Sequence, residues 1–407
     1  MEDRGADERG AQSPFPIVGI GASAGGLEAF TQFLGHLPDQ TGMAFVLVQH
    51  LDPRHESRLT DILARATRMP VIEGSQGLPV APDHVYIIPP NTCMALAQGA
   101  LQLTPRGDAS GPNLPVDHFL RALAQTQQAQ AIGIVLSGTG SDGTLGLLEI
   151  KAVGGITFAQ EPGTAGHGGM PQSAIGSGAV DFVLPPKGIA RRLAEIGAHP
   201  YLAPGPVEAP PAESEDHFRR VLAAVRAATK VDFSQYRDTT VRRRIMRRMA
   251  LHGESSLAAY AERLEQEGPE AEGLYRDLLI NVTSFFRDPA LFEVLKTSVF
   301  PEILKAKPPD APLRLWVPGC STGQEPYSLA IALWEFFDDK PVRRPLQIFA
   351  TDLSDPGSLE RARVGLYPES IGAELTPERL HRFFKKEDHL YRIDKSIRDS
   401  CVFARQN

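Results

Sequence analysis

The chain has 407 residues, 42% of them hydrophobic, which is enough for two or three domains that each bury a core. Its 42 basic side chains are outnumbered by 49 acidic ones, so a net charge of −7 argues against nucleic-acid binding through overall charge. Three widely spaced cysteines without metal-ligand spacing favour a reducing compartment. With neither a signal-peptide pattern nor a long apolar run, we expect a cytoplasmic protein without membrane insertion.

Short β-branched segments alternate with Gly-rich or Pro-rich turns and longer amphipathic segments from Pro16 onward, a pattern typical of βαβ units around a buried parallel sheet. The pattern predicts a doubly wound α/β domain over residues 15–198, preceded by a polar tail, residues 1–14. Strands are expected at 17–20, 44–49, 84–88, 131–136, 155–159 and 182–184. Helices are expected to begin near Gly25, Ser57, Val116, Gly143, Pro171 and Pro186.

The composition changes after the predicted sheet domain. Residues 199–215 are rich in proline and poor in apolar side chains, which predicts a linker. Residues 216–297 follow a 3.6-residue period throughout and predict a small all-α domain. Over residues 298–407 a strand–turn–helix–strand pattern returns, but two or three strands are fewer than a doubly wound sheet needs. We therefore expect an incomplete Rossmann-like domain at this end.

A catalytic site is indicated at the first predicted strand–helix turn. Gly21 to Gly25 has the G-x-S-x-G form of a nucleophile elbow, which would place Ser23 at a helix N-terminus. A serine hydroxyl needs a base and a group that orients the base. His50 ends the second predicted strand and Asp142 follows the fourth, and parallel strands end at one edge of a sheet. The spacing therefore predicts a Ser-His-Asp triad for acyl transfer.

A second interpretation of the same turn is a dinucleotide site. Residues 19–24 also fit the G-x-G-x-x-A fingerprint, and Asp52 could then bind a ribose. Asp52 lies beyond the predicted strand end and precedes a proline, so we rank this interpretation below the triad.

Four segments resemble the signature regions of the chemotaxis protein-glutamate methylesterase (CheB) family, in family order: IVGIGASAGGLEAF, VLVQHLDP, IGIVLSGTGSDGTLG and ITFAQEPGTAGHGGMPQSAI. The resemblance implies that Ser23 is the nucleophile, His50 the general base and acid, and Asp142 the carboxylate that fixes the imidazole, with backbone amides at Ala24 and Thr139 around the oxyanion. It implies hydrolysis of glutamate methyl esters on chemoreceptor helices without a cofactor, and deamidation of glutamine by the same route. Because few residues precede the first strand, we expect no receiver domain in cis.

A second site is indicated near the C-terminus. Gly319 to Gly323 lies between a predicted strand and helix, and the next strand ends on Asp352, an arrangement suited to an adenosyl ligand. Cys320 in this turn has no histidine placed to activate it, which favours a packing role. NVTSFFRD, GCSTGQEPYS and ATDLS resemble the chemotaxis protein-glutamate methyltransferase (CheR) family. The resemblance implies S-adenosylmethionine contacts from Asn281, Thr283, Arg287, Glu325, Asp352 and Asn407.

Five arginines lie on one predicted helix of the all-α domain. The resemblance implies that this helix faces an acidic receptor segment, whereas composition alone favours a solvated amphipathic helix with Ile245, Met246 and Met249 turned inward. The arginines are Arg242, Arg243, Arg244, Arg247 and Arg248.

The later strands of the methyltransferase family have no counterpart before residue 407, so we expect weak or absent binding of S-adenosylmethionine and little methyl transfer. We predict a methylesterase fused to a truncated, inactive methyltransferase. The alternative is a non-enzymatic receptor-binding or scaffold fragment with vestigial sites.

Overall fold

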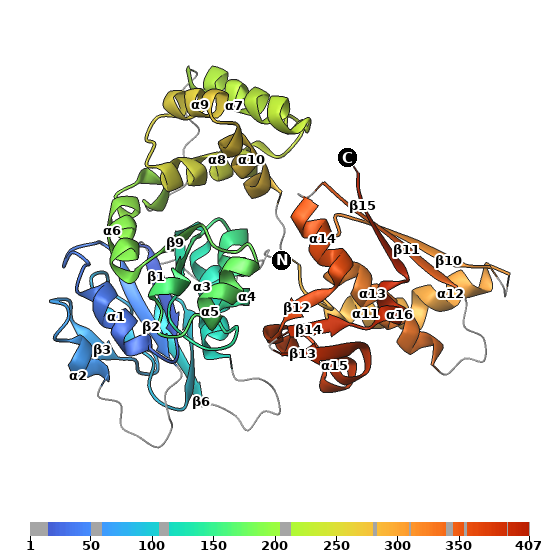
Figure 1. Ribbon diagram of the computed structural model, residues 1–407, viewed down its shortest axis with the longest axis horizontal. Helices are drawn as coiled ribbons and strands as arrows, with labels where there is room; N and C mark the ends of the chain where they lie inside the picture. The colour runs from blue at the N-terminus through green and yellow to red at the C-terminus, as the bar shows by residue number, and fades with distance from the viewer. Residues whose placement is uncertain are drawn as a thin grey trace, which may run out of the picture. The chain divides into compact units, whose positions relative to one another are not determined.

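A computed structural model describes residues 15–49, 59–105, 114–203, 213–279, 283–308, 311–338, 345–353, 356–388 and 390–406. The chain forms two compact units, Met1–Leu278 and Leu279–Asn407 (Figure 1). The first unit ends at Leu278, whereas the sequence pattern predicted a helical domain that extends to residue 297. In the described parts of the chain, no helix has the length and apolar character needed to span a bilayer.

The first unit is built on a seven-stranded sheet in which every neighbouring pair of strands is parallel. This confirms the predicted doubly wound α/β architecture. The central strand β1 is buried at all six positions, because helices cover both faces of the sheet. In spatial order the strands are β3 (Val71–Glu73), β4 (Val85–Ile87), β2 (Ala44–Gln49), β1 (Ile17–Ala22), β7 (Ala131–Val135), β8 (Ile156–Gln160) and β9 (Phe182–Leu184).

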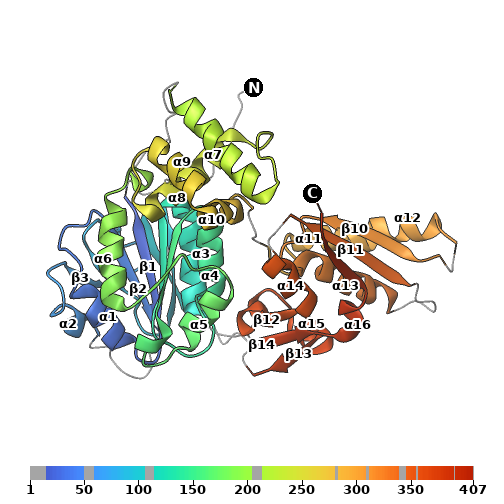
Figure 2. The ribbon, with the colours of Figure 1, turned by 45° about the horizontal axis from the view of Figure 1, so that its top comes forward.

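Helices lie on both faces of this sheet (Figure 2). Apolar side chains of α1 (Gly26–Leu34), α2 (Leu59–Leu63) and α6 (Pro186–Gly197) form a core on one face. Those of α3 (Pro115–Gln127), α4 (Thr144–Ala152) and α5 (Gly169–Gly176) form a second core on the other face. A hairpin that the sequence pattern did not predict, β5 (Thr92–Ala97) and β6 (Ala100–Pro105), turns at Gln98 and Gly99, both at positive φ, and packs against α3.

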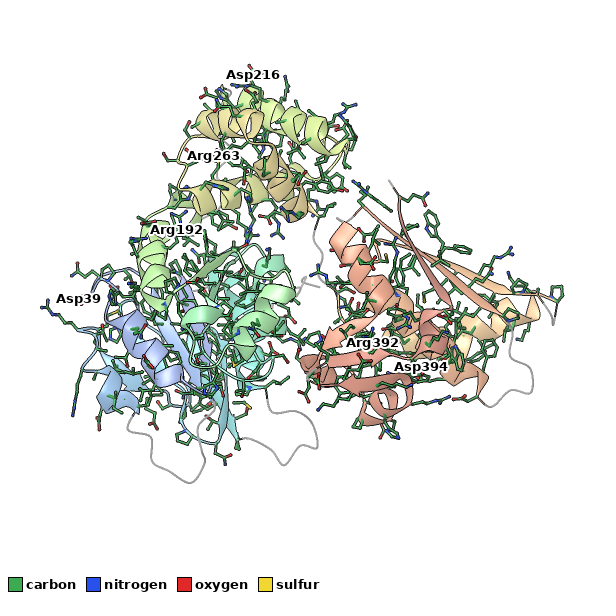
Figure 3. The ribbon with its side chains drawn as sticks, in the orientation of Figure 1. Asp39, Arg192, Asp216, Arg263, Arg392 and Asp394 are labelled. Atoms are coloured by element: carbon green, nitrogen blue, oxygen red, sulfur yellow. The ribbon has the colours of Figure 1, made fainter. Side chains whose placement is uncertain are left out.

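Four helices complete the first unit: α7 (Glu213–Thr229), α8 (Asp238–His252), α9 (Leu257–Gln266) and α10 (Gly268–Leu278). We call this part the helical segment. It packs on the sheet domain through Ala250 and Leu251 of α8, which join the core of α1 and α6 together with Tyr201 and Leu202. The segment predicted as a linker therefore begins with a packed 3₁₀ turn, Pro200–Leu202. Arg192 of α6, labelled in Figure 3, donates to the carbonyl of Leu251 at this contact.

The second unit contains a parallel three-stranded sheet in the order β10 (Leu313–Pro318), β11 (Leu346–Asp352), β15 (Cys401–Arg405). Its core is shared with α13 (Gln324–Phe337) and α14 (Pro356–Val364). A small antiparallel sheet, β12 (Leu366–Pro368), β14 (Leu390–Ile393) and β13 (Phe384–Glu387), was not predicted. The remaining described helical elements are α11 (Pro289–Val294), a π-helical stretch (Leu295–Val299), α12 (Phe300–Lys305), a 3₁₀ turn (Glu369–Ala373), α15 (Pro377–Phe383) and α16 (Lys395–Arg398).

Candidate functional site

Ser23 lies in the turn between β1 and α1, at the carboxyl edge of the seven-stranded sheet. Its backbone N–H donates to the carbonyl of Ser137 at 2.9 Å, and its own carbonyl accepts from Gly26 at 2.9 Å. The hydroxyl of Ser137 donates to the carbonyl of Ala24 at 2.8 Å. The loop after β7 thus fixes the turn that carries Ser23 through two hydrogen bonds.

Two glycines of the G-x-S-x-G pattern are required by their surroundings. A Cβ on Gly21 would lie 2.1 Å from Cγ1 of Val116, in the first turn of α3. Gly25 has a φ of +75°, and a Cβ there would lie 2.6 Å from the hydroxyl oxygen of Ser137. Any larger residue at either position would displace the turn or its support.

The loop that carries Thr139 passes close to Ser23. A Cβ on Gly138 would lie 3.0 Å from Cβ of Ser23 and 2.1 Å from Sδ of Met170. Gly138 is anchored on both sides, because its N–H donates to the carbonyl of His167 and its carbonyl accepts from Met170, each at 2.9 Å. Thr139 is the next residue after Gly138, which is in contact with Ser23, so the backbone of Thr139 passes close to the serine.

Asp142 is buried, with 2% of its surface exposed. Its Oδ1 accepts from the backbone N–H of Asp117 at 2.8 Å and its Oδ2 from that of Val116 at 3.0 Å. Both donors belong to the first turn of α3, where free N–H groups and the helix dipole stabilise a negative charge. Val116 therefore connects the two halves of the site, since its side chain fills the space beside Gly21 and its amide binds Asp142.

The predicted base, His50, lies outside the described residues, and so do Asp52, Asn281 and Asn407. Gln49 ends β2, is paired with Ala22 in the sheet register, and its side-chain amide donates to the carbonyl of Ser23 at 3.4 Å. The chain therefore leaves β2 beside the serine turn. Sequence reasoning did not single out Ser137 or Asp117, whose roles depend on contacts between distant segments.

The glycine-rich turn of the second unit offers an open backbone surface. Gly319 has a φ of +72°, and none of the described residues comes within 4 Å of a Cβ placed on it. A carboxylate oxygen of Asp352, at the end of β11, accepts from the N–H of Ser321 in this turn at 2.6 Å. Glu325 is exposed in the first turn of α13. These residues fit an adenosyl ligand, because the open glycine permits close approach and the carboxylate lies at the strand end.

The predicted Thr283 and Arg287 flank two buried phenylalanines of the second unit. The N–H of Phe286 donates to the hydroxyl of Ser328 at 2.9 Å, and Ser328 lies one turn beyond Glu325 on α13. This hydrogen bond attaches the segment of Thr283 and Arg287 to the helix that carries Glu325.

Cys320 is buried in the glycine-rich turn, with 1% of its surface exposed. Burial, with the nearby charge of Asp352, raises the pKa of its thiol to about 12. The thiol therefore stays protonated at neutral pH, which supports the packing role expected for it.

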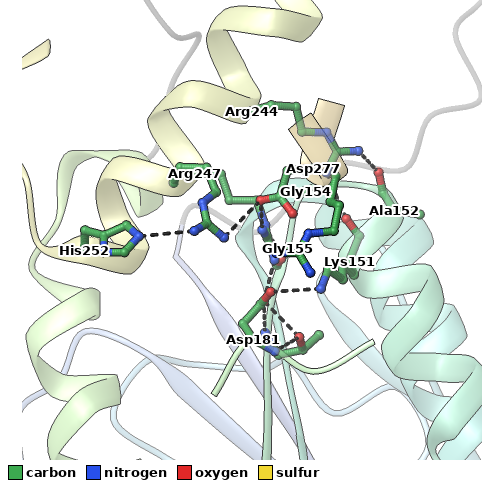
Figure 4. A network of polar contacts seen from close by, with 12 residues as sticks. Lys151, Ala152, Gly154, Gly155, Asp181, Arg244, Arg247, His252 and Asp277 are labelled. Carbon is green, nitrogen blue, oxygen red and sulfur yellow. Dashed lines mark hydrogen bonds and ion pairs between the residues drawn. The ribbon is translucent and has the colours of Figure 1, made fainter. Parts of the chain in front are cut away.

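The arginine-rich helix α8 differs from what the sequence indicated. Arg247 is 0% exposed: it ion-pairs with Asp181 and Asp277, and its Nε donates to the carbonyl of Gly155 at 3.0 Å (Figure 4). Arg244 is also buried and donates to the carbonyls of Lys151 and Ala152, the last residues of α4. The expectation that these two arginines face a receptor is therefore wrong, because the sheet domain covers them.

The other arginines of α8 lie in partly buried surroundings. Arg242 pairs with Glu215 at 2.6 Å and Arg248 with Glu270, both within the helical segment, and Arg243 is half-buried. Ile245 and Met249 are buried, as the amphipathic interpretation predicted.

The contacts of Arg247 and Arg244 lie at the amino edge of the sheet. Gly155 precedes β8 and Asp181 precedes β9, whereas Ser23 follows β1 and Thr139 follows β7. Since all strands are parallel, the helical segment and the serine turn lie at opposite edges.

The first unit is an α/β domain with a glycine-flanked serine in the turn after its central strand. Residues 18–193 match the family model of the CheB methylesterase, residues 216–279 that of the CheR methyltransferase all-alpha domain, and residues 281–407 that of the CheR methyltransferase SAM binding domain. The chain thus carries a domain of the CheB methylesterase family followed by the two domains of the CheR methyltransferase family.

Individual proteins are also similar to this chain. An uncharacterized 104.1 kDa protein from the hypE 3′ region of Rhodobacter capsulatus is 35% identical over 375 residues, which are 86% of this chain and 39% of that protein. The protein-glutamate methylesterase/protein-glutamine glutaminase 1 of Syntrophus aciditrophicus is 35% identical over 45% of this chain and 52% of its own length. The crystal structure of the Thermotoga maritima CheB methylesterase catalytic domain matches with 31% identity and a TM-score of 0.43, over 45% of this chain and all of that one. The chain spans about half the length, or less, of these curated relatives.

Proposed function

We propose that the chain hydrolyses methyl esters of glutamate side chains on chemoreceptor helices, with Ser23, His50 and Asp142 as catalytic residues. The observation that carries the proposal is the position of Val116, which packs against the glycine before the serine turn and binds Asp142 through its amide. The nucleophile turn and the carboxylate are thereby supported by one helix end. The resemblance of residues 18–193 to methylesterases supplies the substrate class.

In the proposed reaction, the hydroxyl of Ser23 attacks the ester carbonyl carbon while His50 accepts its proton. Backbone amides at Ala24 and Thr139 donate to the oxyanion. The intermediate collapses as His50 returns the proton to the leaving methoxide, which releases methanol. Water activated by His50 then cleaves the acyl-enzyme, freeing the glutamate carboxyl group and the serine, and a glutamine amide would release ammonia by the same route.

The test is methanol release from a methylated receptor by the whole chain. Ser23→Ala is expected to lower kcat by several orders of magnitude. Ser177→Ala, at the end of α5, is the matched control and should leave the rate unchanged. Full hydrolysis by the Ser23 variant would refute the assignment.

The scaffold alternative is separated by labelling with a fluorophosphonate. An activated serine forms a covalent adduct, whereas a vestigial site has no activated hydroxyl. Labelling that is lost in Ser23→Ala supports the hydrolase, and no labelling of the folded wild-type chain supports the scaffold.

For the second unit we propose that S-adenosylmethionine binds weakly and that methyl transfer is slow. Glu325, Asp352 and the segment of Thr283 and Arg287 would contact the ligand. The proposed reason for weak binding is that one face of the sheet is uncovered. Exposed on such a face are Trp316, Phe349 and Val402, which align across the described strands. Calorimetric titration tests it, with Asp352→Ala as control. Micromolar binding that the control abolishes would overturn it.

A further inference from the structure

A second buried carboxyl group lies beside Asp142. Asp117, in the first turn of α3, is 3% exposed, and its Oδ1 accepts from the backbone N–H of Gly146 at 2.7 Å. Its Oδ2 is buried and has no hydrogen-bond partner among the residues that the structure describes. The proposed reaction does not use this side chain directly.

The two carboxyl groups connect two helix ends reciprocally. Asp142, two residues before α4, accepts from the N–H groups of Val116 and Asp117 in the first turn of α3. Asp117 in turn accepts from Gly146 in the first turn of α4. The N-terminus of α3 is thus capped by a carboxyl group from the turn before α4, and that of α4 by a carboxyl group from the first turn of α3. The same three hydrogen bonds fix the approach of α3 to α4 and the orientation of Asp142.

The surroundings of Asp117 favour its protonated form. Burial raises its pKa well above the usual range, and the nearby charge of Asp142 raises it further. Backbone N–H groups of Gly146 and Gly143 and the charge of Arg121 act in the opposite direction but do not outweigh burial. Arg121 is itself paired with Glu149 at 2.5 Å, and His118 on the same helix is exposed. Asp117 therefore serves as an oxygen acceptor more than as a second negative charge.

We propose that Asp117 is a positioning residue for ester hydrolysis, which acts by holding α4 against α3 so that Asp142 keeps both of its backbone donors. This inference rests on the proposed function of Ser23, His50 and Asp142. Asp117 would thus affect kcat although it does not contact the substrate.

The test compares two substitutions of similar size in the whole chain. Asp117→Asn keeps an oxygen acceptor for Gly146 and should retain kcat within about threefold, with the acid limb of the pH profile unchanged. Asp117→Leu removes the acceptor and should lower kcat about 10- to 100-fold, because small displacements of catalytic groups have effects of this order. KM should stay within about twofold in both, because Asp117 lies outside the substrate contacts. Asp117→Ala replaces the leucine variant if that protein does not fold.

Two further variants make the result specific. Leu123→Ala removes a buried side chain two turns along α3 and should lower Tm without the same loss of kcat. Wild-type kcat in Asp117→Leu, an equal loss in Asp117→Asn, or an equal loss in Leu123→Ala at matched Tm would each overturn the inference. Ser23→Ala is measured in parallel: if it stays active the proposed function itself fails, whereas its inactivity with an active leucine variant refutes only the role of Asp117.

Discussion

Arg247 of α8 and Asp181, which precedes β9, form an ion pair in which neither side chain has appreciable contact with solvent. The pair joins the helical segment to the sheet domain, and Lys151 and Asp277 extend it on either side. Charges removed from water are tolerated when they are paired and hydrogen-bonded, as they are here. The helical segment and the sheet domain therefore form one compact unit, and buried charged side chains lie at the centre of their contact.

Arg247→Ala should lower the free energy of unfolding of the first unit by about 3–5 kcal/mol, because it removes the buried cation that two buried carboxylates share. Calorimetric or denaturant unfolding of the whole chain measures this. Arg220→Ala is the matched control, since Arg220 makes an exposed ion pair with Glu265 at 2.9 Å and its loss should lower the free energy of unfolding far less. Equal losses in both variants would contradict the importance of burial.

The first unit, both at this contact and within the helical segment, should become less stable in acid. Burial opposes ionisation of Asp181 and Glu270, but Arg247 and Lys151 lower the pKa of Asp181, and hydrogen bonds from His252 and Arg248 help lower that of Glu270 to about 2. Carboxyl groups with depressed pKa stabilise the folded state above their unfolded pKa, and this contribution disappears as pH falls through the folded value. We expect Tm to fall steadily from about pH 4.5 to pH 2. In Glu270→Gln, the decrease from that variant's own Tm at pH 7 should be smaller. An unchanged Tm over this range would refute the prediction.

Gly21→Ala should destabilise the sheet domain by about 1–3 kcal/mol and lower hydrolysis, because the new methyl group meets Val116. Val116→Ala creates space at that point without changing the amide that binds Asp142. The double variant should therefore recover part of the Tm lost in Gly21→Ala. If the double variant is less stable than the sum of the two single losses predicts, the steric conflict with Val116 does not explain the loss in Gly21→Ala.

Two of the three cysteines should resist alkylation. Burial raises the pKa of Cys320 and of Cys401 to about 12, so little reactive thiolate is present at pH 8. Iodoacetamide should label both only slowly in the native chain and rapidly after denaturation, with mass spectrometry reporting each site. Native labelling of Cys320 at the denatured rate would show that the glycine-rich turn is open to reagent.

The strands of the sheet domain could be predicted because buried parallel strands are continuously apolar. The segment of β2, AFVLVQ, is an example, and glycines or prolines mark most of the helix starts. The hairpin of β5 and β6 was missed because its buried and half-buried positions give little contrast in sequence. β3 has three residues, too few for a periodic signal.

Local motifs singled out Ser23 and Asp142 as candidates, because each follows a strand in a glycine-rich turn. Ser137 follows a strand in the same glycine-rich turn, but nothing local indicates its hydrogen bond to the distant Ala24. Asp117 lies in no such turn, and its partner Gly146 is 29 residues away. The arginines of α8 show the same limit. Composition could not distinguish Arg247, which is buried, from an arginine on a solvated face, because its carboxylate partners come from the residue before β9 and from α10.

Helix α4 begins two residues after Asp142 and ends on the carbonyls that Arg244 binds. A fragment cut at residue 198 would keep the serine turn but expose Gly155, Asp181 and the end of α4 to water. Such a fragment should exchange amide hydrogens faster at 150–156 than the chain that retains α8. A separately expressed sheet domain should therefore extend through Leu278, although the match to the CheB methylesterase family model ends at residue 193.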